Sequence, residues 1–298
     1  MGDITLREAL EEYKSIFMAS RNFAQRTRVE YLSDIEDLIQ FLEKNGLKEV
    51  KFIGLPQLER YLAELDHRGM AGSTRKRKVV SIRSFLWYLY QDNYLRTNLS
   101  KRIIPPFAEA NSPRYLTKSE YERLLEASSH NLRDLALIQL LLQTGIKLSE
   151  LTGLTIDDVE LPSGILSEMN EAGLLHIIGS KSRKGRTIPL NTKASISLAN
   201  YLKRRKAVSD TALFTNRFGK PLGSRGVEKI VSKYMLQASI RDASVQSLRH
   251  TFGIHHIVSG ANLKMIQEVM GHRDGRTTSI YHSLVKGAIS KELQEHTL

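Results

Sequence analysis

Two short stretches carry the residues that decide how this chain is read: Ser247-Leu248-Arg249-His250-Thr251-Phe252, and Met-Gly-His-Arg-Asp-Gly-Arg-Thr-Thr-Ser-Ile-Tyr at residues 270–281. They present, in order, a guanidinium, imidazoles and a phenol. Each group is a weak indication alone, since a tyrosine near a C-terminus is usually a packing residue. Together they are the groups that bind a phosphate and attack it. The order of these residues therefore matters more than any single one.

Two further segments lie N-terminal to these stretches. Residues 144–151 read Thr-Gly-Ile-Lys-Leu-Ser-Glu-Leu, and the apolar run Leu132–Leu142 before them predicts a buried helix that ends near Thr144-Gly145. Residues 174–178 and 187–190 are short β-type runs around Gly-Ser-Lys-Ser-Arg-Lys-Gly-Arg at 179–186, which predicts a hairpin with a basic tip. Upstream, Thr117 followed by Glu120 predicts a capped helix start.

These segments together resemble the motifs of the tyrosine recombinase (phage integrase) family. Residues 144–151 resemble its Thr-Gly-Leu-Arg-x-Ser-Glu-Leu box, and residues 248–252 its Leu-Arg-His-Thr-Phe core. The Gly271-His272 pair, with Tyr281 nine residues after the histidine, resembles its nucleophile box. The likeness spans nearly the whole chain and is closest to short Xer-like and transposon or phage integrase members.

The resemblance implies a mainly α fold with a small β-sheet. An N-terminal helical DNA-clamp domain (residues 1–104) would be joined by a linker (105–113) to a mixed α/β catalytic domain (114–298). The Pro-rich composition of 105–113 independently favours an extended linker. The implied function is a site-specific recombinase, an enzyme that cuts and rejoins DNA through a 3′-phosphotyrosyl intermediate on Tyr281.

The chemistry of such a site assigns a role to each candidate. Tyr281 supplies the attacking oxygen, Arg249 holds the non-bridging phosphate oxygens with its planar fork of donors, and His272 donates a further hydrogen bond. Lys181 at the hairpin tip is the expected general acid for the leaving 5′ oxygen. Lys184 is the alternative, because this hairpin has one residue more than the common family form and the alignment of the two lysines is ambiguous. Glu150, Asp157 and Asp158 are expected to orient side chains or to cap helices.

Two positions depart from the family boxes. Lys147 stands where the family has arginine, and it keeps the charge but loses the bidentate fork. Gln246 stands where the family has histidine, and a glutamine can donate a hydrogen bond but cannot exchange a proton near neutral pH. A recombinase-derived DNA-binding protein with impaired cleavage is therefore an alternative. A helical transcription regulator is a third reading, which leaves the ordered series through Tyr281 unexplained.

His250 has two readings that the sequence does not separate. It is either a structural histidine whose hydrogen bonds are satisfied, or a residue that orients the catalytic groups.

The first hundred residues read as a small helical bundle. Tyr31, Ile35, Leu38 and Leu42 form one apolar stripe, and Val80, Phe85, Leu86 and Leu89 form another. The run Gly72-Ser73-Thr74-Arg75-Lys76-Arg77-Lys78 predicts a helix start with a strongly basic first turn, which opposes the helix dipole unless a phosphate offsets it. The expected DNA contacts are Arg75, Lys76, Arg77, Lys78, Arg83, Arg183, Lys184, Lys220 and Arg225.

The composition favours a polyanionic partner and excludes several classes. Lys plus Arg outnumber Asp plus Glu by 44 to 32, which gives a net charge of +12. No apolar run approaches the roughly 20 residues that span a bilayer, and the N-terminal residues are too acidic for a signal peptide, so we expect a cytoplasmic protein without a membrane partner. The absence of cysteine, of HExxH and of a GxxxxGK[ST] loop leads us to expect no metal, cofactor or ATP.

The tail after Tyr281 carries Val285, Ile289 and Leu293 at four-residue spacing, an apolar stripe on a short helix. It could cap its own core. The resemblance instead implies that it docks onto a neighbouring protomer, so that the expected partners are a double-stranded recombination site and other copies of the chain, in a tetramer on DNA.

Overall fold

The computed structural model describes residues 4–107, 112–162, 173–179, 185–205, 211–272 and 281. The chain divides into two compact units, unit 1 (Met1–Asn111) and unit 2 (Ser112–Leu298). The finer domain limits inferred from the sequence, at residues 104 and 114, stay a prediction. In the described ranges no helix is long and apolar enough to cross a lipid bilayer.

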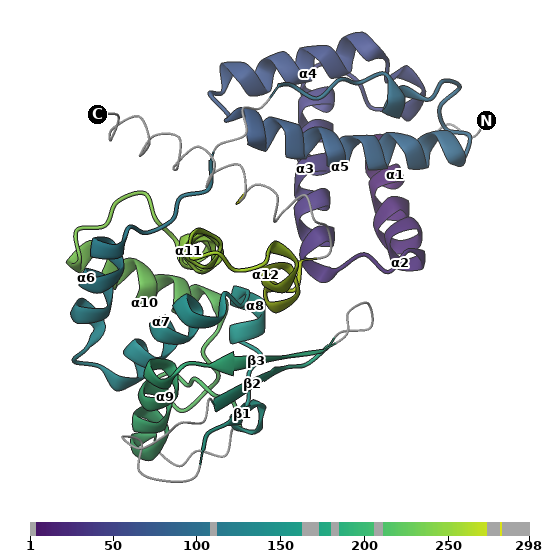
Figure 1. Cartoon of the computed structure of the whole chain (residues 1–298). Coiled ribbons are helices and arrows are strands. Elements are labelled where there is room, and N and C mark those ends of the chain that lie inside the picture. Colours follow the sequence, from purple (N-terminus) through teal and green to yellow (C-terminus); the bar gives the residue numbers. More distant parts are fainter. Residues whose placement is uncertain are drawn as a thin grey trace, which may run out of the picture. The chain divides into compact units, whose positions relative to one another are not determined.

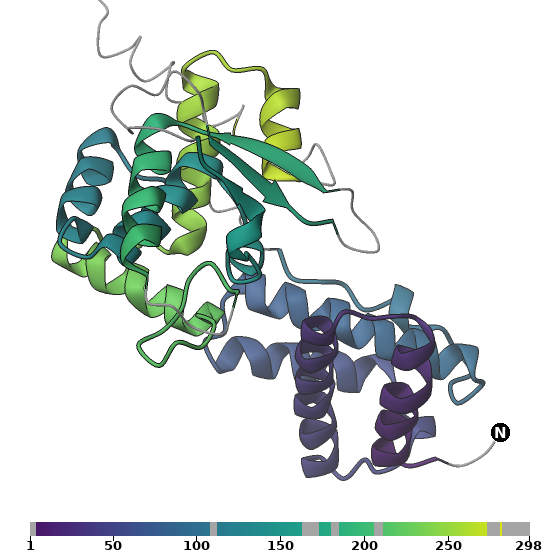
Figure 2. The same ribbon diagram turned by 90° about the horizontal axis from the view of Figure 1, so that it is seen from below.

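The regular elements of unit 1 in its described residues are helices, joined by turns and one isolated β-bridge between Thr5 and Glu49 (Figure 1). Its first helix, α1, continues through a π-helical stretch into α2, and three longer helices follow. Of these, α4 and α5 lie across α1 and α3 (Figures 1 and 2). Short 3-10 turns at Val50–Phe52 and Leu99–Lys101 connect the longer elements. The bounds are α1 Leu6–Glu12, the π-helical stretch Tyr13–Phe17, α2 Met18–Ser20, α3 Gln25–Lys44, α4 Leu55–His67 and α5 Gly72–Gln91.

The apolar stripes predicted for unit 1 form its core, with one correction. Ile35, Leu38 and Leu42 on α3 are fully buried, and the α5 stripe is buried at Phe85, Leu86 and Leu89. Val80 is 48% exposed, so its inclusion in the stripe was wrong. The reason is the 3.6-residue period: the buried face of α5 continues to Ile82 and Val79, and the next position turns away by about 100°.

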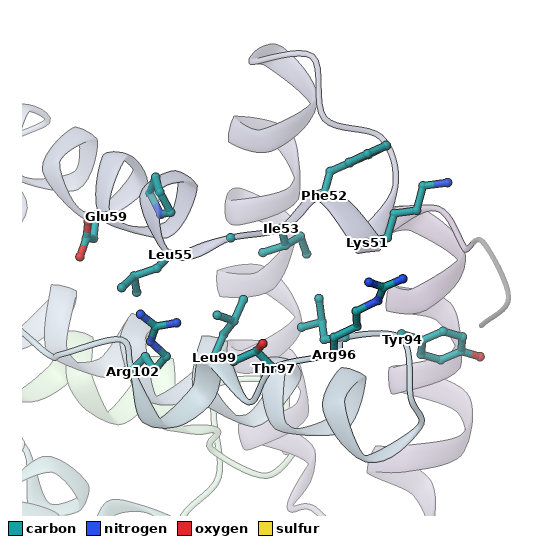
Figure 3. Close-up of a pocket in the computed structure, with 13 residues that line it drawn as sticks. Lys51, Phe52, Ile53, Leu55, Glu59, Tyr94, Arg96, Thr97, Leu99 and Arg102 are labelled. Carbon is teal, nitrogen blue, oxygen red and sulfur yellow. The ribbon is translucent and has the colours of Figure 1, made fainter.

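A cleft of about 800 Å³ lies in unit 1, between the turn at residues 51–53, the start of α4 and the segment 94–102 (Figure 3). Its lining mixes the apolar side chains of Phe52 and Leu95 with the cations Lys51, Arg96 and Arg102. Among the described residues, none of the DNA contacts expected from the sequence lines it.

Unit 2 is built around α7, which is buried along most of its length and packs against α6, α9 and α11. A small sheet lies to one side of these helices (Figure 2). After residue 112 the helices are α6 Lys118–Ser128, α7 Leu132–Thr144, α8 Leu148–Leu151, α9 Thr192–Arg204, α10 Ser224–Gln237, α11 Val245–Val258 and α12 Leu263–Met270, and a 3-10 turn spans Ile156–Asp158.

The predicted hairpin is confirmed by β2 (Gly173–Ile177) and β3 (Arg186–Leu190), which pair antiparallel with Leu175 opposite Ile188. A two-residue strand, β1 (Val159–Glu160), was not predicted and pairs with β2 in the order β1-β2-β3. Leu175, Ile177 and Ile188 face the core, as the alternation of side chains along a strand requires. The mainly α fold with a small sheet is thus confirmed.

The helix ends of unit 2 follow their local sequence. Thr117 caps α6 and shares a capping box with Glu120, as predicted. The helix α7 ends at Gly145 in the left-handed conformation (φ 58°), which glycine adopts without steric cost. A Cβ added at Gly145 would lie 2.5 Å from the ring of Phe252, so the turn is also closed against α11.

Candidate active site

The C-terminal end of α12 gathers cations from three different elements. The carbonyl of Val269 accepts a hydrogen bond from Arg186 Nε (2.6 Å), that of Met270 from Arg249 Nη2 (2.7 Å), and that of Gly271 from Lys147 Nζ (3.0 Å). The last carbonyls of a helix lack partners within it and carry its negative partial charge. The end of this helix therefore holds three cationic side chains beside His272.

Arg249 reaches this point from the middle of α11. Its side chain is 3% exposed, and its guanidinium donates to the carbonyl of Gly145 as well as to that of Met270. The opposite face of α11 is anchored by Thr251, whose hydroxyl accepts a hydrogen bond from the Leu116 backbone N–H (2.8 Å). The helix is thus fixed in rotation, and with it the direction of the guanidinium.

Lys147 is tied to the same cluster through Glu150. The Glu150 carboxylate accepts from the Lys147 backbone N–H (2.9 Å) at the start of α8 and pairs with both terminal nitrogens of Arg186 (3.0 and 2.8 Å). Burial acts to raise the pKa of Glu150, but the hydrogen bonds from Arg186 and Lys147 outweigh it and hold the pKa below its usual value. The prediction that Glu150 orients its neighbours and caps a helix is confirmed, and Asp158 caps in the same way at Thr155.

Tyr281 is buried in this cluster, with 1% of its surface exposed. Its hydroxyl lies 2.9 Å from Nδ1 of His250, and its ring lies 6.1 Å from that of His272 between centroids. A Cβ added at Gly253 would lie 2.8 Å from the tyrosine ring, so only glycine admits the ring at that turn of α11. Burial raises the pKa of Tyr281, and the charge of Arg249 opposes that rise.

The electrostatics of the cluster keep its histidines neutral. Burial lowers the pKa of His272 to about 4, assisted by the charges of Arg249 and Lys147. Burial and Arg249 also lower the pKa of His250. At neutral pH the site therefore combines cationic side chains with uncharged imidazoles, a combination suited to binding the two non-bridging oxygens of a phosphate.

The structure brings together Lys147, Arg249, His272 and Tyr281, four of the six candidates for catalysis. Gln246 lies in the first turn of α11, exposed, one turn before Arg249 and His250 and on the same side of the helix. Lys181 lies outside the described residues, as do Arg183 and Lys184.

The basic residues of α5 are partly engaged inside unit 1. Arg75 pairs with Asp66 (2.6 Å) and Arg77 with Asp34 (2.5 Å), while Arg83 donates to the carbonyl of Ile103. Lys76 is exposed. Acids of α3 and α4 thus lie beside this run and offset part of its charge, and α5 begins at Gly72 after the N-cap Ala71, without a side-chain cap hydrogen bond.

Lys78, which the sequence suggested as a surface cation, is buried instead. It is only 7% exposed, and its ammonium pairs with Asp37 (2.8 Å) and Asp34 (3.3 Å). The position shares the buried face of α5 with Ile82, which turns the lysine into the domain. It is not the surface cation that the sequence suggested. In unit 2, Lys220 and Arg225 are both exposed, the latter in the first turn of α10.

Sequence reasoning missed Arg186 and left His250 undecided. Arg186 is the last residue of the basic run and the first of β3, a position at which it reads as one more hairpin cation. Only the packing of β3 beside α12 reveals its partners. For His250 a signal was present: it lies four residues after Gln246, on the same side of α11 as that family position.

The fold and this site define an enzyme of the tyrosine recombinase class. The model of the phage integrase family matches residues 114–287, and that of the phage integrase N-terminal SAM-like domain matches residues 10–93. The chain belongs to the phage integrase family, whose members of this kind are site-specific recombinases.

Relatives and solved structures are similar to this chain over nearly its full length. The tyrosine recombinase XerC of Roseiflexus castenholzii is 30% identical over 291 residues, which cover 94% of this chain and 90% of that protein. The crystal structure of a lambda integrase dimer bound to a COC′ core site has a TM-score of 0.75 at 16% identity, covering 94% of this chain and 77% of that one. A lambda integrase tetramer bound to a Holliday junction gives 0.73 at 17% identity, covering 91% and 78%.

These comparisons favour a recombinase over the two other readings. The match to the catalytic family model includes the segment through Tyr281, which a transcription regulator leaves unexplained. The reading as a DNA-binding protein with impaired cleavage, based on Lys147 and Gln246, gains no support over recombination.

Proposed function

We propose that this recombinase cuts DNA by attack of the Tyr281 hydroxyl on the scissile phosphate, and that the tyrosine keeps the 3′ phosphate until a second 5′ hydroxyl displaces it. The observation that carries the proposal is the convergence of the Tyr281 hydroxyl, His272 and two cations at the end of α12. Attack at phosphorus needs an oxygen nucleophile and fixed positive charge around the phosphorane oxygens. The phosphotyrosyl bond conserves the energy of the cut bond for rejoining.

Arg249 and Lys147 stabilise the negative charge that develops on the phosphorane. Arg249 is the stronger of the two, because a guanidinium presents five N–H donors in a plane that matches two phosphate oxygens. Lys147 contributes one compact charge. His272 is neutral at pH 7 and donates one ring N–H to the phosphate.

The leaving 5′ oxygen needs a proton, which we assign to Lys181, with Lys184 as the alternative. Both lysines follow β2 in the sequence, outside the described residues, and an ammonium group is an acid able to protonate a leaving alkoxide. Gln246 would donate a hydrogen bond to the phosphate from the first turn of α11.

A nicked suicide substrate tests the proposed nucleophile. DNA carrying the recognition site with a nick just beyond the scissile phosphate loses its short 5′ strand on cleavage, which traps the covalent complex. We expect a denaturant-resistant band from the wild-type protein and none from Tyr281→Phe. A band of equal intensity from Tyr281→Phe would disprove the assignment.

The partners we propose are a double-stranded recombination site and other copies of this chain. The net charge of +12 and the exposed cations Lys76, Lys220 and Arg225 support DNA binding. We further propose that the tail carrying Val285, Ile289 and Leu293, which lies outside the described residues, joins protomers into a tetramer. A chain truncated before Val285 should bind a single site but fail to form the four-protomer complex, and unchanged assembly would favour packing of the tail on its own unit.

A further inference from the structure

The phenol of Tyr281 cannot attack as it stands, because a buried hydroxyl whose pKa is raised must lose its proton as the bond to phosphorus forms. The family motif offers a histidine for that proton at the position of Gln246. An amide side chain cannot accept a proton near neutral pH. The site therefore needs a proton acceptor from another position.

His250 lies where that acceptor is needed. Its Nδ1 is 2.9 Å from the Tyr281 hydroxyl, and the two rings meet nearly edge to face, with centroids 5.7 Å apart and planes at 68°. The residue follows Gln246 by one turn of α11, so both positions present their side chains on the same side of the helix. The family core Leu-Arg-His-Thr-Phe also has a histidine at the position of His250, so this chain keeps that imidazole and lacks the one at Gln246.

The tyrosine ring is held in this place from other sides as well. A Cβ built on Gly253 would lie 2.8 Å from Cε2 of Tyr281 and 3.2 Å from Sδ of Met270. The ring of His272 lies beside it. The hydrogen bond between Tyr281 and His250 is therefore part of a packed arrangement and not a contact of two free side chains.

The charges around the two residues leave His250 able to accept the phenol proton of Tyr281. Arg249 on α11, together with burial, lowers the pKa of His250, so that the ring is neutral at pH 7. The other groups of the cluster are Lys147 before α8, Arg186 on β3 and His272 after α12. The pKa of about 4 at His272 keeps that ring neutral as well.

We propose that Nδ1 of His250 is the general base of this recombinase, replacing the family histidine lost at Gln246. The inference rests on the proposed function of Tyr281. As the Tyr281 oxygen bonds to phosphorus, the phenol proton passes to Nδ1, with the other ring proton on Nε2, and the bond from phosphorus to the 5′ oxygen breaks. The leaving oxygen takes its proton from the general acid. In rejoining, the imidazolium returns its proton to the departing Tyr281 oxygen.

The central variant is His250→Asn, because an asparagine oxygen can take the place of Nδ1 as hydrogen-bond acceptor but cannot accept the proton. In single-turnover cleavage of the suicide substrate we expect a rate about 10²–10⁴-fold below wild type, the usual contribution of general base catalysis. DNA binding in a gel-shift assay should stay unchanged, which excludes misfolding.

The pH profile separates a base from a positioning residue. The wild-type rate should fall as pH drops below the pKa of His250, because the protonated ring cannot accept. In His250→Asn that acidic inflection should vanish, and the rate should rise steadily with pH as solvent takes over as base. An inflection retained at the same pH in His250→Asn would overturn the proposal.

Two rescues sharpen the test. Replacing Tyr281 by 3-fluorotyrosine, a more acidic phenol, should restore at least tenfold of the rate lost in His250→Asn, since less help is needed to remove the proton. Gln246→His in the same background should restore activity by returning the imidazole to the family position.

A 5′-bridging phosphorothiolate, which needs no acid, should not rescue His250→Asn, and full rescue by it would overturn the assignment as base.

The outcomes for His250 and for Tyr281 are distinguishable. If His250→Asn cleaves within threefold of wild type while Tyr281→Phe forms no covalent complex, His250 is not the base and Tyr281 remains the nucleophile. If Tyr281→Phe still forms the complex, the proposed function itself fails.

Discussion

Lys147 shows how one side chain can alter a site without dismantling it. Its ammonium bonds to the Gly271 carbonyl at 3.0 Å, beside the histidine that follows. The lysine ammonium donates one of its three N–H groups to that carbonyl and carries a compact positive charge. An arginine at the same position could keep the carbonyl bond and still present a planar pair of donors to phosphate.

We therefore expect Lys147→Arg to cleave the suicide substrate at the wild-type rate or up to about tenfold faster, which equals about 1.4 kcal/mol of transition-state stabilisation. Lys147→Met is the matched control, and it should be slower because it removes the charge while keeping the length. Single-turnover rates measure both. Complete loss of cleavage in Lys147→Arg would show that this site depends on the smaller ammonium.

His272 gives the protein a pH dependence of stability. Its pKa is about 4 in the folded protein and near 6.5 when unfolded, so the unfolded chain binds more protons between these values. The contribution of this residue to stability is fully present above pH 6.5 and is lost as pH falls toward 4.

Urea unfolding at pH 7.5 and pH 5 should show this loss in the wild type and a smaller one in His272→Gln. The other histidines with lowered pKa, His250 and His256, remain in both proteins, so their effect cancels in the comparison. Equal losses in the two proteins would contradict the assignment.

At the scale of elements, the turn at Gly145 fixes α7 against α11 and offers its carbonyl to Arg249. Gly145→Ala places a side chain in the left-handed conformation and drives its Cβ into Phe252, which should cost about 2–5 kcal/mol from the sum of both effects.

Gly260→Ala is the control for Gly145→Ala. Gly260 is also left-handed, with φ of 85°, but nothing lies within 4 Å of its added Cβ, so the cost should be only about 1–2 kcal/mol. Chemical denaturation of both variants measures the difference. Equal losses would mean that Phe252 yields without cost.

The elements that local sequence controls were predictable from it. The Thr117 cap, the buried helix ending at Gly145 and the β2-β3 hairpin each follow from a cap residue, a left-handed glycine or an alternating apolar run. The strand β1 was missed because two residues carry no periodic signal.

The residues of the site likewise fall into those that the sequence predicted and those that it missed. Arg249, His272 and Tyr281 were found because they lie in motifs, whereas Arg186 was missed because its role depends on the packing of β3 beside α12. Lys78 was misplaced for a related reason, since basic residues in a row look alike until the acids Asp34 and Asp37 of another helix are brought beside one of them.

At the scale of the whole molecule, two neighbouring lysines of α5 separate DNA binding from stability. Lys76→Ala removes an exposed cation, and it should weaken DNA binding, flatten its salt dependence and leave stability within about 0.5 kcal/mol of wild type. Lys78→Ala leaves Asp37 without its ammonium partner and should destabilise unit 1 by roughly 1–3 kcal/mol.

Salt-dependent DNA titration and chemical denaturation of the two variants provide the measurement. A loss of stability in Lys76→Ala as large as that in Lys78→Ala would contradict the division between an exposed and a buried cation.

Strand cleavage by this recombinase, as proposed above, passes through a covalent bond from Tyr281 to the 3′ phosphate of DNA. The most direct measurement is mass spectrometry of the trapped complex after digestion with protease and nuclease. We expect one peptide containing Tyr281 with a nucleotide phosphate attached to its phenol oxygen. A modification found on any other residue, or a cleaved substrate without an attached peptide, would contradict it.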